Sequence, residues 1–145
     1  MRTYRLELVR ESGGDELEET ILRTSTDVAR ELRPLFKGID REKFVVVLLD
    51  AKHRLIGVNT VSIGSLTASI AHPREVFRPA VLLPTAAVVL VHNHPSGDPS
   101  PSGEDIELTK RLREVGELLG IRVLDHVRTG PAASSREDSG SARGA

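Results

Sequence analysis

The chain of 145 residues contains no cysteine and no tryptophan. Without cysteine it can form no disulfide, and any metal ion that it binds must be held by histidine and carboxylate ligands. Only three phenylalanines and one tyrosine are present, so the core must be built from Val, Leu, Ile and Ala. The absence of cysteine fits a reducing compartment, and we expect a cytoplasmic protein.

Neither sign of charge dominates, because 20 basic and 21 acidic residues give a net charge of −1. A protein that binds nucleic acid through phosphate contacts usually carries a basic surplus or a basic stripe, and neither is present. The apolar runs are much shorter than a membrane span, and the charged N-terminus does not resemble a signal peptide. We therefore expect a soluble protein that neither enters membranes nor binds nucleic acid by itself.

Hydrophobic periodicity predicts strands that alternate with helices, which indicates an α/β fold. The predicted strands are residues 4–9, 19–22, 44–49, 54–63, 86–91 and 121–127, and the predicted helices are residues 25–36, 73–83 and 103–119. The hairpin after Phe44 predicts a mixed β-sheet flanked by helices. We expect an N-terminal strand region at 1–24, one domain at 25–129 and a disordered tail at 130–145.

The most informative stretch is VHNHPSGDPSPSGED, residues 91–105, which runs from a buried strand into a predicted helix. His92 and His94 stand two residues apart at the strand end, so their side chains should point to the same face. Asp105 lies in the first turn of the helix, and the intervening loop is long enough to bring its carboxylate to the same ion. Two histidines and one aspartate leave the fourth position of a tetrahedral zinc ion for water, as in catalytic zinc sites.

Each of these residues also has a simpler interpretation. Two histidines at a strand end are by themselves a weak indication of metal binding. Asp105 is favoured in the first turn by the helix dipole, with or without a metal. Ser102 can serve as an N-cap alone. These interpretations leave unexplained why a proline-rich loop joins the histidines to a capped helix at this spacing.

His92-Asn93-His94, seven residues, Ser102, two residues and Asp105 match the pattern HxH-x7-S-x2-D. The chain therefore resembles the JAB/MPN metalloproteases that carry the JAMM motif. The segments HPREVF, HNHPSGDPSPS and LDH resemble the RadC family more narrowly, over residues 25–127. The helix-hairpin-helix region of longer RadC-like proteins has no counterpart before Thr26.

The resemblance implies a JAB/MPN, cytidine-deaminase-like architecture with one zinc ion on His92, His94 and Asp105. It implies a metallopeptidase or isopeptidase that hydrolyses an amide bond of a peptide or protein substrate. It further implies that Glu42 is the general base and that the Ser102 hydroxyl donates toward the oxyanion.

Other residues and functions remain open at this point. Glu19 and Glu75 are weaker candidates for the base, and His126 in LDH either supports the site or has a purely structural role. The main alternative function is a DNA-repair or recombination accessory protein that uses the fold as an interaction module. A metal-free interaction domain is a third possibility, which the complete motif disfavours.

Overall fold

The computed structural model describes residues 1–13, 19–63, 71–93, 103–129 and 134–136. Within these ranges the helices are α1 (Ser25–Phe36), α2 (Pro73–Leu82) and α3 (Gly103–Leu119). The strands are β1 (Lys43–Leu49), β2 (Leu55–Ile63), β3 (Ala87–Asn93), β4 (Arg122–Thr129) and β5 (Ser134–Arg136). None of the described helices is long and apolar enough to cross a membrane.

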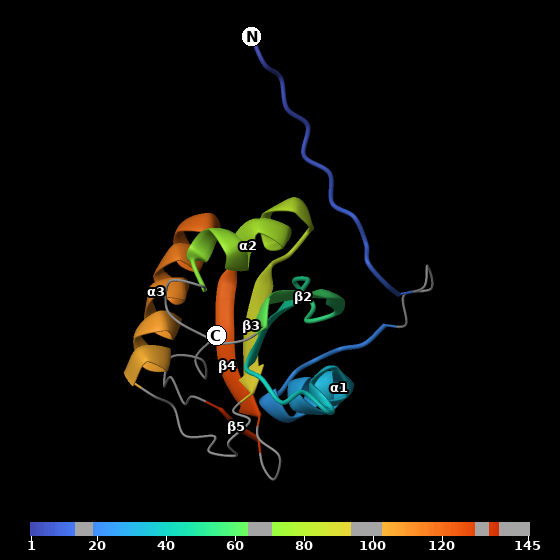
Figure 1. Ribbon diagram of the computed structural model, residues 1–145, viewed down its shortest axis with the longest axis vertical. Helices are drawn as coiled ribbons and strands as arrows, with labels where there is room; N and C mark the ends of the chain where they lie inside the picture. The colour runs from blue at the N-terminus through green and yellow to red at the C-terminus, as the bar shows by residue number, and fades with distance from the viewer. Residues whose placement is uncertain (14–18, 64–70, 94–102, 130–133, 137–145) are drawn as a thin grey trace.

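The strands form one sheet in the order β2-β1-β3-β4-β5. β1 is antiparallel to β2 and β3, β3 is parallel to β4, and β4 is antiparallel to β5. A parallel pair needs a crossover connection, and α3 lies in the connection between β3 and β4. Figure 1 shows α2 and α3 on one side of the sheet and α1 on the other. This arrangement confirms the predicted α/β fold with a mixed sheet flanked by helices.

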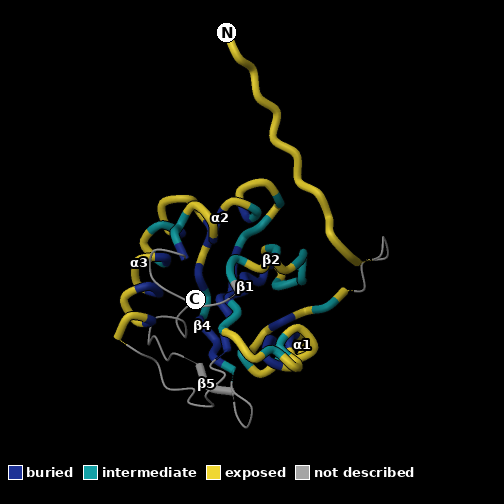
Figure 2. The backbone as a smooth tube through the Cα atoms, viewed as in Figure 1, coloured by how far each residue is buried: buried dark blue, intermediate teal, exposed yellow. Residues whose placement is uncertain are grey.

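The sheet separates two hydrophobic cores. Phe44, Val46 and Leu48 of β1 pack with residues of α2 and α3, whereas Val47 and Leu49 pack with residues of α1. Every residue of β3 is buried as well. In Figure 2, β2 is teal and yellow and the outer surfaces of the helices are yellow, whereas dark blue marks the buried central strands. Burial on both faces explains why β1 and β3 lack the polar and apolar alternation of a half-exposed sheet.

A capping box sets the start of α1. Thr24 Oγ1 accepts a hydrogen bond from the Asp27 N–H, and Asp27 Oδ2 accepts one from the Thr24 N–H, both at 3.1 Å. The pKa of the Asp27 carboxyl is lowered because it accepts hydrogen bonds from the N–H groups of Arg23 and Thr24. Ser25 and Thr26 are also residue types that can cap a helix, but neither is the cap here. Only Thr24 has an acidic residue three positions later, as a capping box requires.

Two other helix boundaries agree with the sequence. His72 Nδ1 accepts a hydrogen bond from the Arg74 N–H at 3.2 Å, and Pro73 begins α2. Proline fits this position because the first N–H of a helix has no partner within the helix. Gly120 follows α3 with a φ of 73°, the left-handed conformation common after a helix.

The strand predicted at residues 4–9 is wrong. These residues are exposed, belong to no strand, and extend away from the folded body in Figures 1 and 2. The strand predicted at 19–22 is reduced to a single bridge, Ile21 to Arg54. That segment meets the start of β2, where the Leu55 N–H donates to the Thr20 carbonyl at 2.8 Å. Alternating apolar residues indicate a preferred face but do not determine whether a neighbouring strand is available.

The disordered tail predicted from residue 130 is wrong at Ser134–Arg136, because β5 pairs there with Val127–Thr129 of β4. Residues 130–133 and 137–145 lie outside the described ranges. A ladder of backbone hydrogen bonds needs no apolar side chain, so a sequence of small and polar residues can still form an edge strand.

Gly116 marks a close approach between α3 and the strand that follows it. A Cβ at this position would overlap the Ile121 carbonyl oxygen and lie 3.2 Å from Phe77 and 3.3 Å from Val123. We expect Gly116→Ala to lower the free energy of unfolding by about 1–3 kcal/mol through overpacking. Urea denaturation measures this change. The matched control is Gly57→Ala in β2, where a Cβ would meet no atom within 4 Å; equal losses in the two variants would contradict the packing argument.

Candidate metal centre

Polar side chains are buried together where the ends of β3 and β4 meet the first turns of α3. The buried polar and charged side chains among the described residues are His92, Asn93, Asp105, Thr109, His126 and Arg128. Burial of polar groups costs free energy unless they are paired with one another. The candidate site is therefore this cluster at the ends of β3 and β4.

The sheet register places three of these side chains on one face. His92 of β3 lies between Phe44 of β1 and Arg128 of β4. His126 pairs with Leu90, two residues before His92. Alternate residues of a strand share a face, and Leu90 belongs to the core beneath α2 and α3. The side chains of His92, His126 and Arg128 therefore face α3.

Asp105 and Thr109 complete the cluster from α3, one helical turn apart. The buried residues of the helix are Asp105, Leu108, Thr109, Leu112 and Gly116. Two apolar residues of this helix, Ile106 and Leu119, lie off the buried face and are 45% and 47% exposed. Two polar residues occupy the buried face, so a pattern built from apolar residues alone misplaces it.

His92 and Asp105 are arranged so that both can bind one metal ion. His92 Nε2 lies 3.7 Å from Asp105 Oδ2. Two donor atoms that each bind a tetrahedral zinc ion at about 2.1 Å lie about 3.4 Å from each other. The observed separation therefore leaves room for a zinc ion, and an imidazole nitrogen with a carboxylate oxygen suits its chemistry.

The other motif residues, His94 and Ser102, fall within 94–102, outside the described residues. In the part of the chain that the structure does describe, no three His, Cys, Asp or Glu side chains gather as a metal site. Of the three predicted metal ligands, the structure therefore describes His92 and Asp105.

Arg128 balances the charge of Asp105. Its side chain is fully buried, and its Nε lies 3.4 Å from Asp105 Oδ2. A buried carboxylate without a partner costs several kcal/mol. The guanidinium therefore stabilises a carboxylate that the fold withdraws from water.

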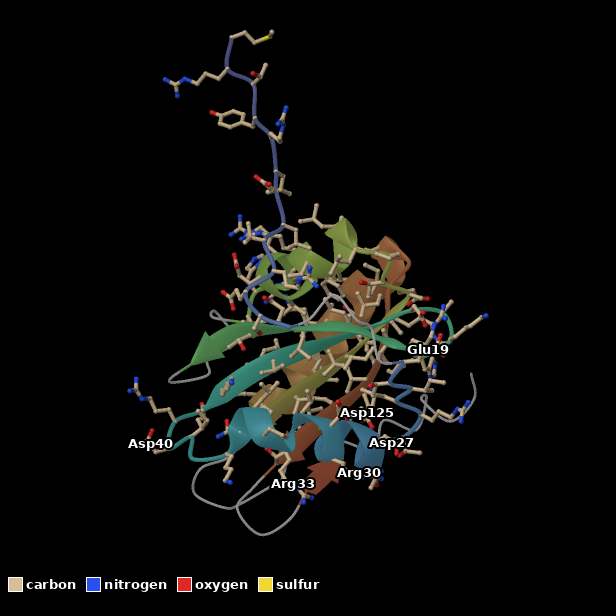
Figure 3. The ribbon with its side chains drawn as sticks, turned by 90° about the vertical axis from the view of Figure 1, so that its right-hand side faces the viewer. Glu19, Asp27, Arg30, Arg33, Asp40 and Asp125 are labelled. Atoms are coloured by element: carbon tan, nitrogen blue, oxygen red, sulfur yellow. The ribbon has the colours of Figure 1, made fainter. Side chains whose placement is uncertain are left out.

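His126 contacts His92 directly. His92 Nδ1 lies 2.6 Å from His126 Nε2, and His126 Nδ1 lies 2.6 Å from Thr109 Oγ1. The preceding residue, Asp125, is labelled beside α1 in Figure 3, and β4 packs against both α1 and α3. His126 therefore lies in direct contact with one of the predicted metal ligands.

Asn93 connects the end of β3 to the segment that carries Glu42. Its Oδ1 accepts a hydrogen bond from the Lys43 N–H at 2.6 Å, and its Nδ2 donates one to the Arg41 carbonyl at 2.9 Å. These two backbone groups flank Glu42. The structure therefore places the backbone of Glu42, the predicted base, beside the end of β3.

Comparison with known proteins identifies the family of this chain. A family model described as a RadC-like JAB domain matches residues 22–140. The chain belongs to the RadC-like JAB domain family. The UPF0758 protein of Moorella thermoacetica is 49% identical over 122 residues, 84% of this chain and 53% of the relative. That of Syntrophotalea carbinolica is 64% identical over 87 residues, 60% and 38% of the two chains. The RadC-like JAB domain described here thus spans about half the length of these relatives.

The weaker candidates for the base have surface partners. Glu75 pairs with Arg78 at 2.9 Å, and Glu19 pairs with Arg54 at 3.3 Å. All four side chains are substantially exposed. Exposed ion pairs of this kind need no functional explanation.

Sequence analysis of this RadC-like JAB domain missed three residues of the site. Thr109 follows Asp105 by four residues, a spacing that puts both on one helix face. Arg128 follows His126 by two residues, a spacing that puts both on one strand face. Asn93 was treated only as the middle residue of the HxH motif. Spacing from a known motif residue is the signal that could have identified the first two.

The Asn93 contacts lead to a test of how the Glu42 segment is held. Asn93→Ala removes the acceptor of the Lys43 N–H, so we expect the Lys43 amide to exchange with solvent at least about tenfold faster. Hydrogen exchange followed by NMR measures this, with the central amide of Val46 as an internal reference. Asn93→Asp keeps the acceptor and should retain protection at Lys43. Unchanged exchange in the alanine variant would show that Asn93 does not hold this segment.

Proposed function

We propose that this RadC-like JAB domain is a zinc-dependent hydrolase that cleaves an amide bond of a peptide or protein. The observation that carries the proposal is the approach of His92 Nε2 to within 3.7 Å of Asp105 Oδ2. Both side chains are buried and both belong to the HxH-x7-S-x2-D pattern. The separation and the donor chemistry suit one zinc ion better than a plain His–Asp hydrogen bond, which needs a shorter distance.

His92 and Asp105 would hold the ion together with the predicted third ligand, His94. When bound, zinc polarises a carbonyl group and lowers the pKa of a bound water to about 7. The chain keeps its two described ligands on rigid elements, a central strand and the first turn of a helix. Ligands on such elements are held more firmly than ligands on loops.

Glu42 supplies the general base in this proposal. Its carboxylate takes a proton from the attacking water as the new C–O bond forms, and it returns that proton to the amine nitrogen as the C–N bond breaks. The Ser102 hydroxyl donates toward the developing oxyanion. Asn93 supports the proposal, because its two hydrogen bonds fix the backbone on both sides of Glu42. A base held in this way loses little conformational freedom on reaching the transition state.

The chemistry can be tested without knowing the natural substrate. The zinc-loaded protein is incubated with a peptide library in H2(18)O, and the products are analysed by mass spectrometry. We expect new carboxyl termini that each carry one oxygen from the solvent. Glu42→Gln should keep its zinc and hydrolyse at least about 100-fold more slowly, because it has lost the base.

The matched control is Asp40→Asn, a neighbouring acid whose side chain is 93% exposed. It should retain both zinc and turnover. Wild-type rates in Glu42→Gln would show that another group is the base. Absence of hydrolysis by the zinc-loaded wild-type protein across the library would contradict an amide hydrolase of broad sequence tolerance.

A further inference from the structure

An unbroken series of hydrogen bonds joins one proposed metal ligand to the other. It runs from His92 Nδ1 to His126 Nε2 at 2.6 Å, and from His126 Nδ1 to Thr109 Oγ1 at 2.6 Å. It continues from Thr109 Oγ1 to the backbone carbonyl of Asp105 at 2.8 Å. Three elements take part, since His92 is on β3, His126 on β4, and Thr109 and Asp105 on α3.

The direction of the series follows from its last acceptor. A backbone carbonyl can only accept, so the single hydroxyl proton of Thr109 is donated to the Asp105 oxygen. The Thr109 oxygen then accepts from His126, which requires the proton of the His126 ring to be on Nδ1. A neutral imidazole protonated at Nδ1 has its lone pair on Nε2. His126 Nε2 therefore accepts the proton that His92 carries on Nδ1.

The hydrogen bond at Nδ1 determines whether the other ring nitrogen of His92 is protonated. With the proton on Nδ1, the lone pair of His92 is on Nε2, the atom that lies 3.7 Å from Asp105 Oδ2. This is the nitrogen that must be unprotonated to bind a metal. The hydrogen-bond series thus selects the tautomer of His92 that is ready to coordinate, and it fixes the orientation of the ring.

Burial makes this selection effective. Thr109 and His126 are completely buried, and His92 is 1% exposed. Phe44 packs edge-on against the His126 ring, with their centroids 5.9 Å apart. A lost hydrogen bond at such a depth is costly, because the low local dielectric strengthens the bonds that exist and penalises groups left without one.

We propose that Thr109 and His126 are positioning residues that hold His92 in the tautomer whose Nε2 is unprotonated before any metal arrives. The inference rests on the proposed function in that it takes His92 to be a zinc ligand. It goes beyond that function by assigning the preparation of the ligand to a threonine and a histidine that do not themselves touch the ion.

A pair of nearly isosteric substitutions tests the role of the hydroxyl. Thr109→Val removes the hydroxyl and keeps the shape, whereas Thr109→Ser keeps the hydroxyl and removes a methyl group. Zinc affinity is measured by competition with a chelator of known strength. Loss of a group that orients a metal ligand usually lowers metal affinity about 10- to 100-fold. We expect a decrease of this size in the zinc affinity of Thr109→Val. The zinc affinity of Thr109→Ser should remain within about threefold of wild type, because serine can make the same hydrogen bonds.

The tautomer is read directly in the metal-free protein. Nitrogen NMR of histidine-labelled protein at about pH 8, where an unperturbed imidazole is neutral, distinguishes a protonated ring nitrogen from one with a lone pair. We expect wild-type His92 to be protonated at Nδ1 alone, and Thr109→Val to show a mixture of both forms. A purely structural threonine would affect thermal stability without changing the tautomer.

Two results would overturn the inference. One is a wild-type His92 that carries its proton on Nε2, and the other is a valine variant with the same zinc affinity as the serine variant. The spectrum of the wild-type protein decides the matter even if a variant fails to fold. If the wild-type protein bound no zinc, the proposed function would fail, and the spectrum would still show whether the hydrogen bonds select the tautomer.

Discussion

The structure depends above all on the burial of one carboxylate, that of Asp105 in the first turn of α3. The residue is 7% exposed, and its charge would cost several kcal/mol if it were withdrawn from water without partners. Arg128 Nε supplies a partner of opposite charge from β4, at 3.4 Å. The same helix face carries Leu108 and Leu112 into the main core. The packing of α3 against the sheet therefore also places the Asp105 carboxylate in the site.

The end of β3 serves the site from both of its faces. His92 points toward α3 and Asp105, whereas Asn93 binds the backbone on either side of Glu42. Successive residues of a strand point in opposite directions. Two adjacent positions can therefore provide a proposed metal ligand and the hydrogen bonds that hold the backbone around the proposed base. A two-sided, fully buried strand is rigid, which suits a site that must keep its ligands in place before the metal binds.

Periodicity and motif spacing were enough to predict much of this architecture. The strand predicted at 44–49 is β1, the helix predicted at 103–119 is α3, and the HxH-x7-S-x2-D pattern predicted that His92 and Asp105 lie close together, as they do. Glu42 was different, since only the family resemblance singled it out, and its role as base remains a prediction. Thr109 and Arg128 were missed because a buried polar residue disrupts the apolar pattern that marks a buried face. Their burial is explained only by partners that are distant in sequence, which local periodicity cannot supply.

The most direct test of the account is the zinc content of the purified protein after loading with zinc and extensive dialysis, determined by elemental analysis. The proposed site predicts about one zinc per chain, which Asp105→Ala should lose. Glu104→Ala, a change of the exposed neighbour in the same helical turn, should retain it. A wild-type protein without zinc, or an Asp105→Ala variant with its full complement, would contradict the assignment of His92, His94 and Asp105 as the metal centre.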